Sequence, residues 1–398
     1  MPQIKILVVS DLHTGTNKDD EVDTKLTFDD QPNIFGKSLL AYLKDLNADI
    51  DILICTGDIG NKGCIQSFKA GWKYLNWLAD ELNIETILSV PGNHDHQSRP
   101  TEDKSPSGFS PKHELQFASP AFPFNDFNKN THFWAWNWEL SVNEYFNCVS
   151  LNSSAYHGFG SEFKHGRVAL EVCDQIESRL LSSDIKPKPF NLLICHHHPQ
   201  KMDYIDKTYD GEAMEGADYL LNKLENSDLG PWLIIHGHKH YATICYGNSR
   251  TSCPPTILSA GSLSAVLYHT LALQTSNQFY ILTIDIDLTN EYGKVVGTFE
   301  THEANPLNNW QPSSSENLPA KGGFGSLYTT AQILSYLRNV INPDNSFLEG
   351  DELMDFKKKI LNMPPYELNS LLRKLADEGF NLTHDSDGEI TEIGKCYE

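Results

Sequence analysis

Polar side chains that bind metals recur in this sequence in short groups, each placed directly after a run of apolar residues. The groups are S-D-L-H from Ser10, T-G-D-I-G from Thr56, G-N-H-D from Gly92, C-H-H-H-P from Cys195 and H-G-H-K-H from His236. Each group alone is typical of an ordinary turn, because Gly, Asp and Asn are common turn residues. Five such groups in succession predict instead that the chain brings them together in one site.

The donor atoms in these groups are the oxygens and nitrogens of carboxylate, carboxamide and imidazole groups. Donors of this kind favour a borderline divalent metal over a structural zinc, which cysteine ligands would indicate. The donors are too many for one ion, and a carboxylate such as Asp58 can bridge two. Two ions so placed clamp the attacking and leaving oxygens of an in-line phosphoryl displacement.

A layered α/β domain is the architecture that would position these groups. Strand and helix patterns alternate from residue 4 to about 300, as such a domain requires. The apolar runs that precede the five groups are Ile4–Val9, Ile50–Cys55, Thr86–Val90, Phe190–Cys195 and Trp232–Ile235. Because open α/β sheets bind their ligands at the carboxyl ends of the strands, we expect the five groups at one sheet edge.

The motifs D-x-H, G-D, G-N-H-D, H-x-P and G-H-x-H, in this order, resemble those of the calcineurin-like metallophosphoesterase superfamily over roughly residues 4–300. The resemblance implies a four-layer αββα sandwich of two mixed β-sheets, with a dinuclear metal site at the carboxyl edge of the strands. It also implies two divalent metal ions, drawn from Mn²⁺, Fe²⁺ or Fe³⁺, Zn²⁺ and Ni²⁺. By matching positions, one ion would bind Asp11, His13 and His240, the other would bind Asn93, His197 and His238, and Asp58 would bridge both.

Three consecutive histidines make the choice of His197 depend on two further observations. Side chains alternate along a strand, so His196 and His198 are expected to point away from the side of His197. The H-x-P spacing anchored on Pro199 selects His197 as well. His196 and His198 are therefore predicted to lie around the site or at its rim, and His236 is predicted to pack within its strand.

The resemblance also assigns catalytic roles to two residues of the third group. His94 would face the substrate and either stabilise the transferring phosphoryl group or protonate the leaving oxygen. Asp95 would accept a hydrogen bond from the His94 ring and fix its tautomer. The nucleophile would be a hydroxide that bridges the two metal ions. His96 matches no role.

The function favoured by this resemblance is hydrolysis of phosphodiester bonds in nucleotides or small phosphodiesters. Asn152–Ala155 (N-S-S-A) and Ser259–Ser264 (S-A-G-S-L-S) resemble the bacterial branch that contains class III cyclic-nucleotide phosphodiesterases and glycerophosphodiesterases. Three alternatives remain open: a nuclease acting on DNA or RNA, a phosphomonoesterase, and a scaffold that binds partners through its C-terminal part. The intact ligand set argues against the scaffold.

Two long loops follow candidate site residues and set this chain apart from that branch. Thr14–Phe35 is charged and Gln97–Asn130 is rich in Pro, Ser and Phe, so both are expected as a rim or lid of the site. The aromatic run Phe133–Trp138 either stacks a nucleobase or forms one face of a half-buried strand. Its period of two favours the strand.

The net charge, the apolar runs and the cysteines indicate which partners and which cellular compartment to expect. The 31 basic and 53 acidic residues give a net charge of −22, so nonspecific binding to duplex DNA is not expected. No apolar run is long enough to span a bilayer, and the N-terminus lacks a signal-peptide layout. Eight scattered cysteines without a C-x-x-C pair fit free thiols in a reducing compartment. We therefore expect a cytoplasmic protein without a membrane partner.

A change in composition near His302 predicts where the catalytic part ends. Residues 1–301 are expected to form the metallophosphoesterase catalytic domain, and residues 302–326, rich in Pro, Ser, Asn and Gly, a linker. Residues 327–398 are expected to form a small helical module that is winged-helix-like or an adaptor. Its expected elements are helices over Leu327–Val340, Gly350–Leu361 and Pro365–Glu378 and a hairpin around Ser386–Gly388. Its mixed charge favours docking of a protein partner over DNA reading.

Overall fold

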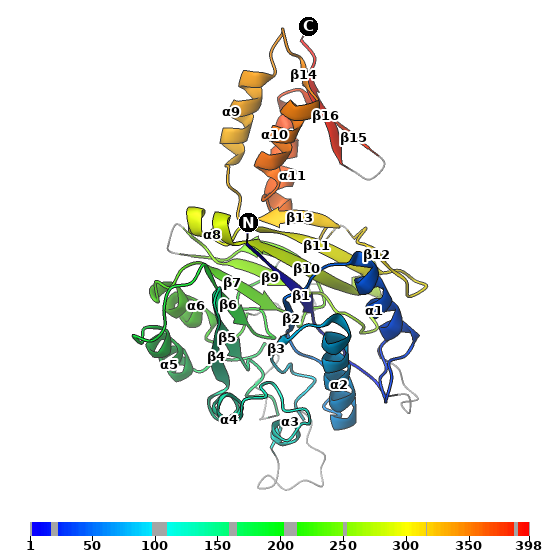
Figure 1. Ribbon diagram of the computed structural model, residues 1–398, viewed down its shortest axis with the longest axis vertical. Helices are drawn as coiled ribbons and strands as arrows, with labels where there is room; N and C mark the ends of the chain where they lie inside the picture. Colours follow the sequence, from blue (N-terminus) through cyan, green and yellow to red (C-terminus); the bar gives the residue numbers. More distant parts are fainter. Residues whose placement is uncertain are drawn as a thin grey trace.

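Two large β-sheets lie face to face in the computed structural model, with helices on both outer sides and a small module at one end (Figure 1). The structure describes residues 2–16, 23–97, 110–158, 165–202, 213–249, 253–315, 317–385 and 389–397. Helices, two mixed sheets and helices again form the four layers of an αββα sandwich, which confirms the predicted fold class.

The larger sheet contains the first strand of the chain and the strands that follow the first two helices. Its strands are β1 (Gln3–Val9), β2 (Ile52–Cys55), β3 (Thr86–Ser89), β10 (Gln278–Asp285), β11 (Gly297–Ala304), β12 (Trp310–Pro312) and β13 (Lys321–Phe324). Their order is β12-β11-β10-β1-β2-β3, with β13 also paired to β11. Because β1, β2 and β3 are parallel, the residues that follow them emerge at the same edge.

The smaller sheet is parallel in its middle and antiparallel at its two edges. Its strands are β4 (Trp138–Val142), β5 (Phe146–Leu151), β6 (Phe190–Ile194), β7 (Trp232–His236), β8 (Thr243–Tyr246) and β9 (Thr256–Ser259). They follow the order β4-β5-β6-β7-β9-β8, in which β5, β6, β7 and β9 are parallel. The residues after β6 and β7 therefore also emerge together.

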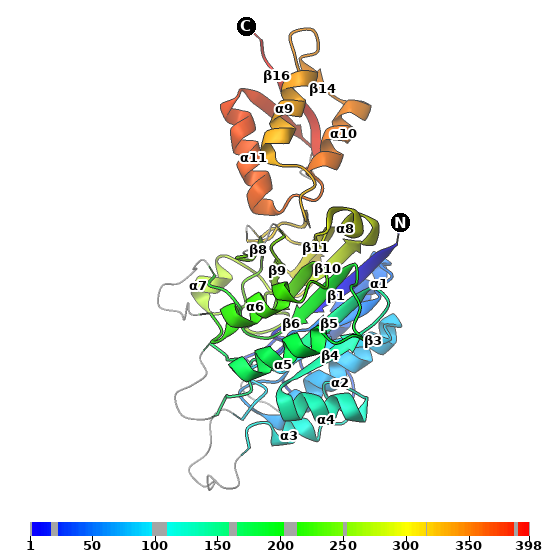
Figure 2. The same ribbon diagram turned by 90° about the vertical axis from the view of Figure 1, so that its left-hand side faces the viewer.

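Helices cover the outer faces of the two sheets (Figures 1 and 2). Helices α1 (Ile34–Leu46) and α2 (Ile65–Leu82) lie beside the larger sheet, and α5 (Leu170–Leu180) and α6 (Ala217–Asn226) lie beside the smaller one. The remaining helices of this part are α3 (His113–Gln116), α4 (Phe127–Trp136), α7 (His269–Ala272) and α8 (Ile286–Tyr292). Helix α1 begins at Asn33, whose Oδ1 accepts a hydrogen bond from the Gly36 amide at 3.1 Å.

Alternate residues of β6 belong to two different hydrophobic cores. Leu192 and Ile194 pack in the core shared with the larger sheet. Leu193 and Cys195 pack in the core beneath α5 and α6. This alternation decides which side chains beyond β6 face the edge between the two sheets.

The segment predicted as a linker contributes two strands and the end of a third to the larger sheet. Strands β12 and β13 lie within residues 302–326, and both pair with β11. The hydroxyl groups of the serines at 313–315 donate hydrogen bonds to the Glu303 carboxylate. A Cβ atom at Gly323 would lie 2.0 Å from the Leu361 carbonyl oxygen. The linker prediction is therefore wrong, because here Ser and Gly serve hydrogen bonding and close packing rather than flexibility.

The C-terminal module has its own core and consists of α9 (Thr330–Val340), β14 (Phe347–Leu348), α10 (Gly350–Ile360), α11 (Pro365–Asp377), β15 (Phe380–His384) and β16 (Ile390–Lys395). The three predicted helices and the hairpin strands are present, and the hairpin tip at Ser386–Gly388 lies outside the described residues. The sheet order is β14-β16-β15. Its elements follow the order helix, strand, helix, helix, strand, strand.

The module packs on the end of the larger sheet where β1 begins. Asn362, in the turn between α10 and α11, donates a hydrogen bond from Nδ2 to the Gly297 carbonyl oxygen at 3.0 Å. Gly297 pairs with Ile284, and Ile284 pairs with Ile4 at the start of β1. The module therefore lies at the opposite end of this sheet from the residues that follow β1.

The aromatic run at Phe133–Trp138 is mostly helical, so the predicted strand is wrong there. Asp126 caps the start of helix α4 by accepting a hydrogen bond from the Lys129 amide at 2.8 Å, and the helix extends to Trp136. Phe133 and Trp134 are buried within it.

Among the described residues, no helix combines the length and apolar character that a bilayer crossing needs.

Candidate metal centre

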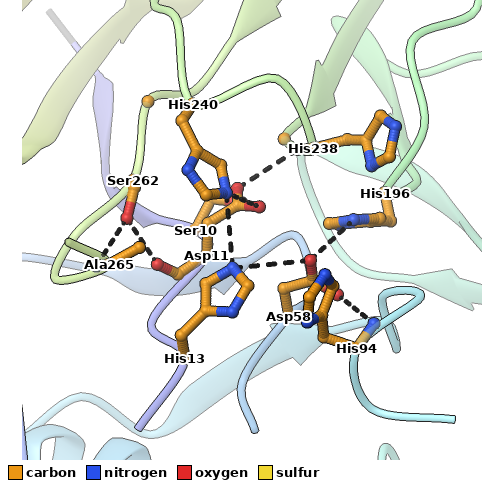
Figure 3. A network of polar contacts seen from close by, with 12 residues as sticks. Ser10, Asp11, His13, Asp58, His94, His196, His238, His240, Ser262 and Ala265 are labelled. Atoms are coloured by element: carbon orange, nitrogen blue, oxygen red, sulfur yellow. Dashed lines mark hydrogen bonds and ion pairs between the residues drawn. The ribbon is translucent and has the colours of Figure 1, made fainter. Parts of the chain in front are cut away.

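The loops after β1, β2, β3, β6 and β7 meet at one edge of the sandwich (Figure 3). Histidine and aspartate side chains from these loops form four overlapping groups of three, in each of which one donor atom per residue lies within 4.8 Å of the others. The groups are Asp11, His13 and His240; His13, Asp58 and His94; Asp11, Asp58 and His196; and His196, His197 and His238. All five polar groups of the sequence are thus brought together.

The first set of donors surrounds Asp11 at the end of β1. Its Oδ1 lies 3.2 Å from Nε2 of His240, and Nε2 of His240 lies 3.3 Å from Nε2 of His13. Ser10 holds the other carboxylate oxygen by donating its hydroxyl hydrogen at 2.5 Å. The predicted set of Asp11, His13 and His240 therefore converges on one point (Figure 3).

The second set of donors surrounds Asn93 after β3. Its Oδ1 lies 3.0 Å from Nε2 of His196 and 3.0 Å from Nδ1 of His238. Asp58 Oδ2 lies 3.3 Å from Nε2 of His196 and 3.6 Å from Nε2 of His13. Asp58 thus stands between the two sets, where the sequence predicts a bridging carboxylate.

His196, which the sequence pattern places outside the ligand set, lies beside Asn93 and Asp58. Both rings border the site, because a donor atom of each lies within 4.8 Å of the other and of a donor atom of His238. Leu192 and Ile194 face the core between the sheets, and His196 continues this alternation towards Asp58. The prediction that His196 lies at the rim is therefore wrong, because the H-x-P spacing does not report which face of the strand meets the larger sheet.

His197 lies beside the site and is tied to the loop after β5. Its Nδ1 is 2.9 Å from the Ser153 hydroxyl, and its ring centre is 5.6 Å from that of His157. Its buried Nε2 has no hydrogen-bond partner in the described part of the chain, and a donor atom of its ring lies within 4.8 Å of donors of His196 and His238. We assign His196, rather than His197, to the set around Asn93.

Five of the candidate ligands have strained backbones. The φ angles are 51° at Asp11, 46° at His13, 50° at Asp58, 79° at His238 and 55° at His240. A positive φ is unfavourable for residues with a Cβ atom, at a cost of about 1–3 kcal/mol each. Because this strain is concentrated in one set of polar residues, we infer that these backbone conformations lower the local stability but position the side chains of the site.

Burial and neighbouring charges set the protonation of the site. Burial raises the pKa of Asp58, but the positive charge of His196 and the hydrogen bond from its ring outweigh this effect and hold that pKa well below its usual range. Burial lowers the pKa of His13 to about 3, with His94 adding to the effect, so His13 is neutral. Burial also acts to lower the pKa of His196, but the charge of Asp58 outweighs it and raises the pKa to about 9.

These donors fit two metal ions. Among the residues that the structure describes, the buried Oδ1 of Asp11 has no hydrogen-bond donor. Nε2 of His13 lies 3.3 Å from Nε2 of His240, a distance at which the two ring nitrogens share either a proton or a cation. Oxygen and nitrogen donors without cysteine suit a borderline divalent ion. One ion would be held by Asp11, His13 and His240, the other by Asn93, His196 and His238, with Asp58 between them.

His94 is placed as a hydrogen-bond donor beside these ligands. The Lys62 amide donates to Nδ1 of His94 at 3.3 Å. A main-chain amide can only donate, so the proton of the neutral ring lies on Nε2. Burial lowers the pKa of His94, which keeps the ring neutral. The His94 amide donates to Oδ1 of Asp58 at 2.7 Å, which ties the ring position to the carboxylate between the two donor sets.

Asp95 does not contact the His94 ring, so that predicted contact is wrong. Its two carboxylate oxygens accept hydrogen bonds from the Gly60 amide at 2.7 Å and the Gly92 amide at 2.8 Å. It therefore joins the loop after β2 to the loop after β3. His96, for which the sequence suggests no role, hydrogen-bonds through Nδ1 to the Gly92 carbonyl oxygen at 2.9 Å and holds the same turn.

Comparison with known proteins identifies the family. The family model described as calcineurin-like phosphoesterase matches residues 4–242. A protein of Vesicomyosocius okutanii subsp. Calyptogena okutanii, described as a probable cyclic nucleotide phosphodiesterase, is 24% identical over 281 residues, which are 70% of this chain and 97% of that protein. The candidate ligands of the loops after β1, β2, β3, β6 and β7 all lie inside the matched range.

Solved structures with a similar fold include two phosphatases. The yellow lupin (Lupinus luteus) purple acid phosphatase PPD1 has a TM-score of 0.47 and 15% identity, over 76% of this chain and 52% of that chain, so this chain spans about half of the lupin protein. A dimetal phosphatase from Danio rerio has a TM-score of 0.40 and 12% identity, over 71% of this chain and 94% of that chain. Because the family model matches more than half of the sequence, this protein belongs to the calcineurin-like phosphoesterase family and is a hydrolytic phosphoesterase.

Proposed function

We propose that this phosphoesterase is a dinuclear-metal-dependent phosphodiesterase that acts on nucleotides or small phosphodiesters. The observation that carries the proposal is the position of Asp58 between two donor sets, 3.6 Å from His13 and 3.3 Å from His196. A carboxylate so placed can bridge two ions. The relative described as a probable cyclic nucleotide phosphodiesterase supports a diester substrate.

The protein side chains around the donors have separable tasks in this proposal. Bound metal ions would neutralise phosphate charge and lower the pKa of a water molecule towards neutrality. His94 directs an N–H group at the reacting phosphate and donates its Nε2 proton to the leaving oxygen. The hydrogen bond from the Lys62 amide keeps that proton on Nε2, and the Asp95 carboxylate keeps the two loops in register.

The charge of the protein and the surface next to the site support this substrate class. A net charge of −22 repels a polyanion such as duplex DNA more strongly than a small diester with one negative charge. The Ser262 hydroxyl donates to the Asp11 carbonyl oxygen at 2.7 Å, and the same loop continues into Val266 and Tyr268, which are exposed. These apolar side chains offer a surface for the organic part of the substrate.

An activity panel tests this proposal. Metal-stripped protein supplied with Mn²⁺ is assayed on bis-p-nitrophenyl phosphate, p-nitrophenyl phosphate, cyclic nucleotides and single-stranded DNA. We expect the diester and cyclic nucleotides to be hydrolysed faster than the monoester, and DNA slowest. A chain that binds two metal ions yet hydrolyses none of these would refute the proposal, and a preference for the monoester or for DNA would replace the diester with that substrate.

A further inference from the structure

Thr56, the residue directly after β2, is not a candidate ligand but is joined to both sets of donors. It is completely buried. Its hydroxyl donates a hydrogen bond to Oγ of Ser10 at 2.7 Å, and its carbonyl oxygen lies 2.8 Å from Nδ1 of His196. Ser10 contacts Asp11 of the first set, and His196 belongs to the second. One residue therefore connects the two sets.

The hydroxyl side of this connection fixes which oxygen of Asp11 faces the site. A carboxylate can only accept, so Ser10 gives its one hydroxyl hydrogen to Oδ2 of Asp11 at 2.5 Å. Oγ of Ser10 can then only accept from Thr56, whose hydroxyl must be the donor. The His238 amide donates to the same Oδ2 at 3.2 Å. Two donors thus hold Oδ2, and Oδ1, which lies 3.2 Å from Nε2 of His240, is left for a metal ion.

The carbonyl side of the connection fixes which nitrogen of His196 faces the site. A carbonyl oxygen can only accept, so Nδ1 of His196 carries a hydrogen and donates it to Thr56. Nε2 is then the nitrogen directed at Asn93 and Asp58, at 3.0 Å and 3.3 Å. A hydrogen bond to one ring nitrogen of a histidine leaves the other in place as the metal-binding atom.

The two hydroxyl groups are enclosed by the main chain at Gly237. A Cβ atom at this position would lie 2.1 Å from Oγ of Ser10 and 2.5 Å from Oδ2 of Asp11. Ser10, Asp11 and Thr56 have no exposed surface, so bulk water does not replace a hydrogen bond that is lost among them. The line from Thr56 to Asp11 therefore depends on these two hydroxyl groups.

We propose that Thr56 is a positioning residue of the metal centre, which acts through the Ser10 hydroxyl to hold Asp11 with Oδ1 free for a metal ion. Its carbonyl oxygen holds His196 for the other ion at the same time. The inference rests on the proposed metal-dependent function. Hydrogen bonds behind metal ligands orient them, and their loss typically costs 10–100-fold in metal affinity.

Calorimetric titration of metal-stripped protein with Mn²⁺ tests this role without any substrate. In Thr56→Val and in Ser10→Ala we expect the affinity of one of two sites to fall by about 10–100-fold. The other site should keep its affinity, because both variants retain the Thr56 carbonyl oxygen. Since Thr56 acts through Ser10, the double variant should bind Mn²⁺ no more weakly than Ser10→Ala alone.

Two further variants separate positioning from a loss of stability. Thr56→Ser retains the hydroxyl and should bind Mn²⁺ as the unaltered protein does. Thr289→Val is the matched control, because Thr289 is also completely buried and its Oγ1 accepts a hydrogen bond from the Val296 amide at 3.1 Å. Thr289 lies in α8, whose Ile286 amide donates to the Pro2 carbonyl oxygen at the opposite end of β1 from the site. This variant should have a lower melting temperature but unchanged Mn²⁺ affinity.

The outcomes separate this inference from the proposed function. Two bound Mn²⁺ ions in the unaltered protein, together with unchanged affinity in Thr56→Val or losses that simply add in the double variant, would overturn the role of Thr56 alone. An equal loss of affinity in Thr289→Val would overturn it as well. If Ser10→Ala does not fold, the comparison of Thr56→Val with Thr56→Ser decides, and equal affinities in these two would overturn the role. Failure of the unaltered protein to bind Mn²⁺ would refute the metal-dependent function and the role of Thr56 with it.

Discussion

Nε2 of His196 lies 3.3 Å from Oδ2 of Asp58, in the buried space between the two sets of donors. Without a metal ion, a proton on His196 balances the negative charge of that carboxylate. The carboxylate charge has a larger effect than burial and raises the pKa of His196 to about 9. A metal ion at this place would take over the role of the proton. Metal binding and protonation of His196 should therefore compete.

The first prediction is that Mn²⁺ binding releases a proton. At pH 7.5 His196 is protonated in the metal-free protein, because its pKa is raised to about 9, and a histidine must be neutral to bind a metal ion. The apparent Mn²⁺ affinity should rise about tenfold per pH unit up to that pKa. Calorimetry in two buffers with different ionisation enthalpies measures the released proton, and equal binding heats in both buffers would contradict the prediction.

The second prediction distinguishes two neighbouring histidines. His196→Ala removes a donor that lies 3.0 Å from Oδ1 of Asn93, so the protein should retain about one metal ion instead of two. His197→Ala removes a ring held by the Ser153 hydroxyl and should retain both. Metal content measured by mass spectrometry after dialysis decides between them. The reverse pattern would show that the H-x-P spacing identifies the ligand correctly.

The third prediction concerns the proton donor. In His94→Ala the candidate ligands are intact, so metal content should be unchanged. Loss of a positioned proton donor should lower kcat by about 10²–10⁴-fold, with a smaller change in KM. Steady-state kinetics on bis-p-nitrophenyl phosphate, with metal analysis of the same samples, measures both. Loss of a metal ion in this variant would mean that His94 is a ligand rather than a donor.

The fourth prediction is that acid destabilises the metal-free protein through buried neutral histidines. Burial lowers the pKa of His96 and of His236 to about 4, whereas both residues titrate near 6.5 when unfolded. Between these values the unfolded chain binds more protons, so the free energy of unfolding falls as pH falls. Each histidine should contribute about 1.4 kcal/mol per pH unit in that window.

Urea denaturation in the presence of a chelator, at pH 6.5, 5.5 and 4.5, tests this pH dependence. His96→Gln keeps a side chain that can donate to the Gly92 carbonyl oxygen but does not titrate. Its free energy of unfolding should fall less steeply with acid than that of the unaltered protein. Parallel pH profiles of the two proteins would exclude His96 as a source of acid sensitivity.

Much of the site could be predicted because its residues follow strands that are readable as apolar runs. The carboxyl ends of parallel strands must meet, so Asp11, Asp58 and Asn93 could be placed together from their positions alone. The exchange of His196 for His197 could not be foreseen from the run Phe190–Cys195. Every residue of this strand is buried, so its composition does not reveal which face meets the larger sheet.

Other features were hidden because they depend on contacts between distant segments. The serines after β12 look like those of a linker, but they hydrogen-bond to Glu303. Asp23 lies in a charged loop, and only the fold brings it to Lys62. The Asp95 carboxylate accepts a hydrogen bond from the Gly60 amide of another loop. Local patterns do not encode such pairings.

The most direct test of the two-ion centre is the anomalous scattering of Mn²⁺ in crystals of this protein. We predict two peaks on either side of Asp58, one against Asp11, His13 and His240 and the other against Asn93, His196 and His238. A single peak, or peaks that do not contact Asp58, would contradict a dinuclear centre bridged by this carboxylate.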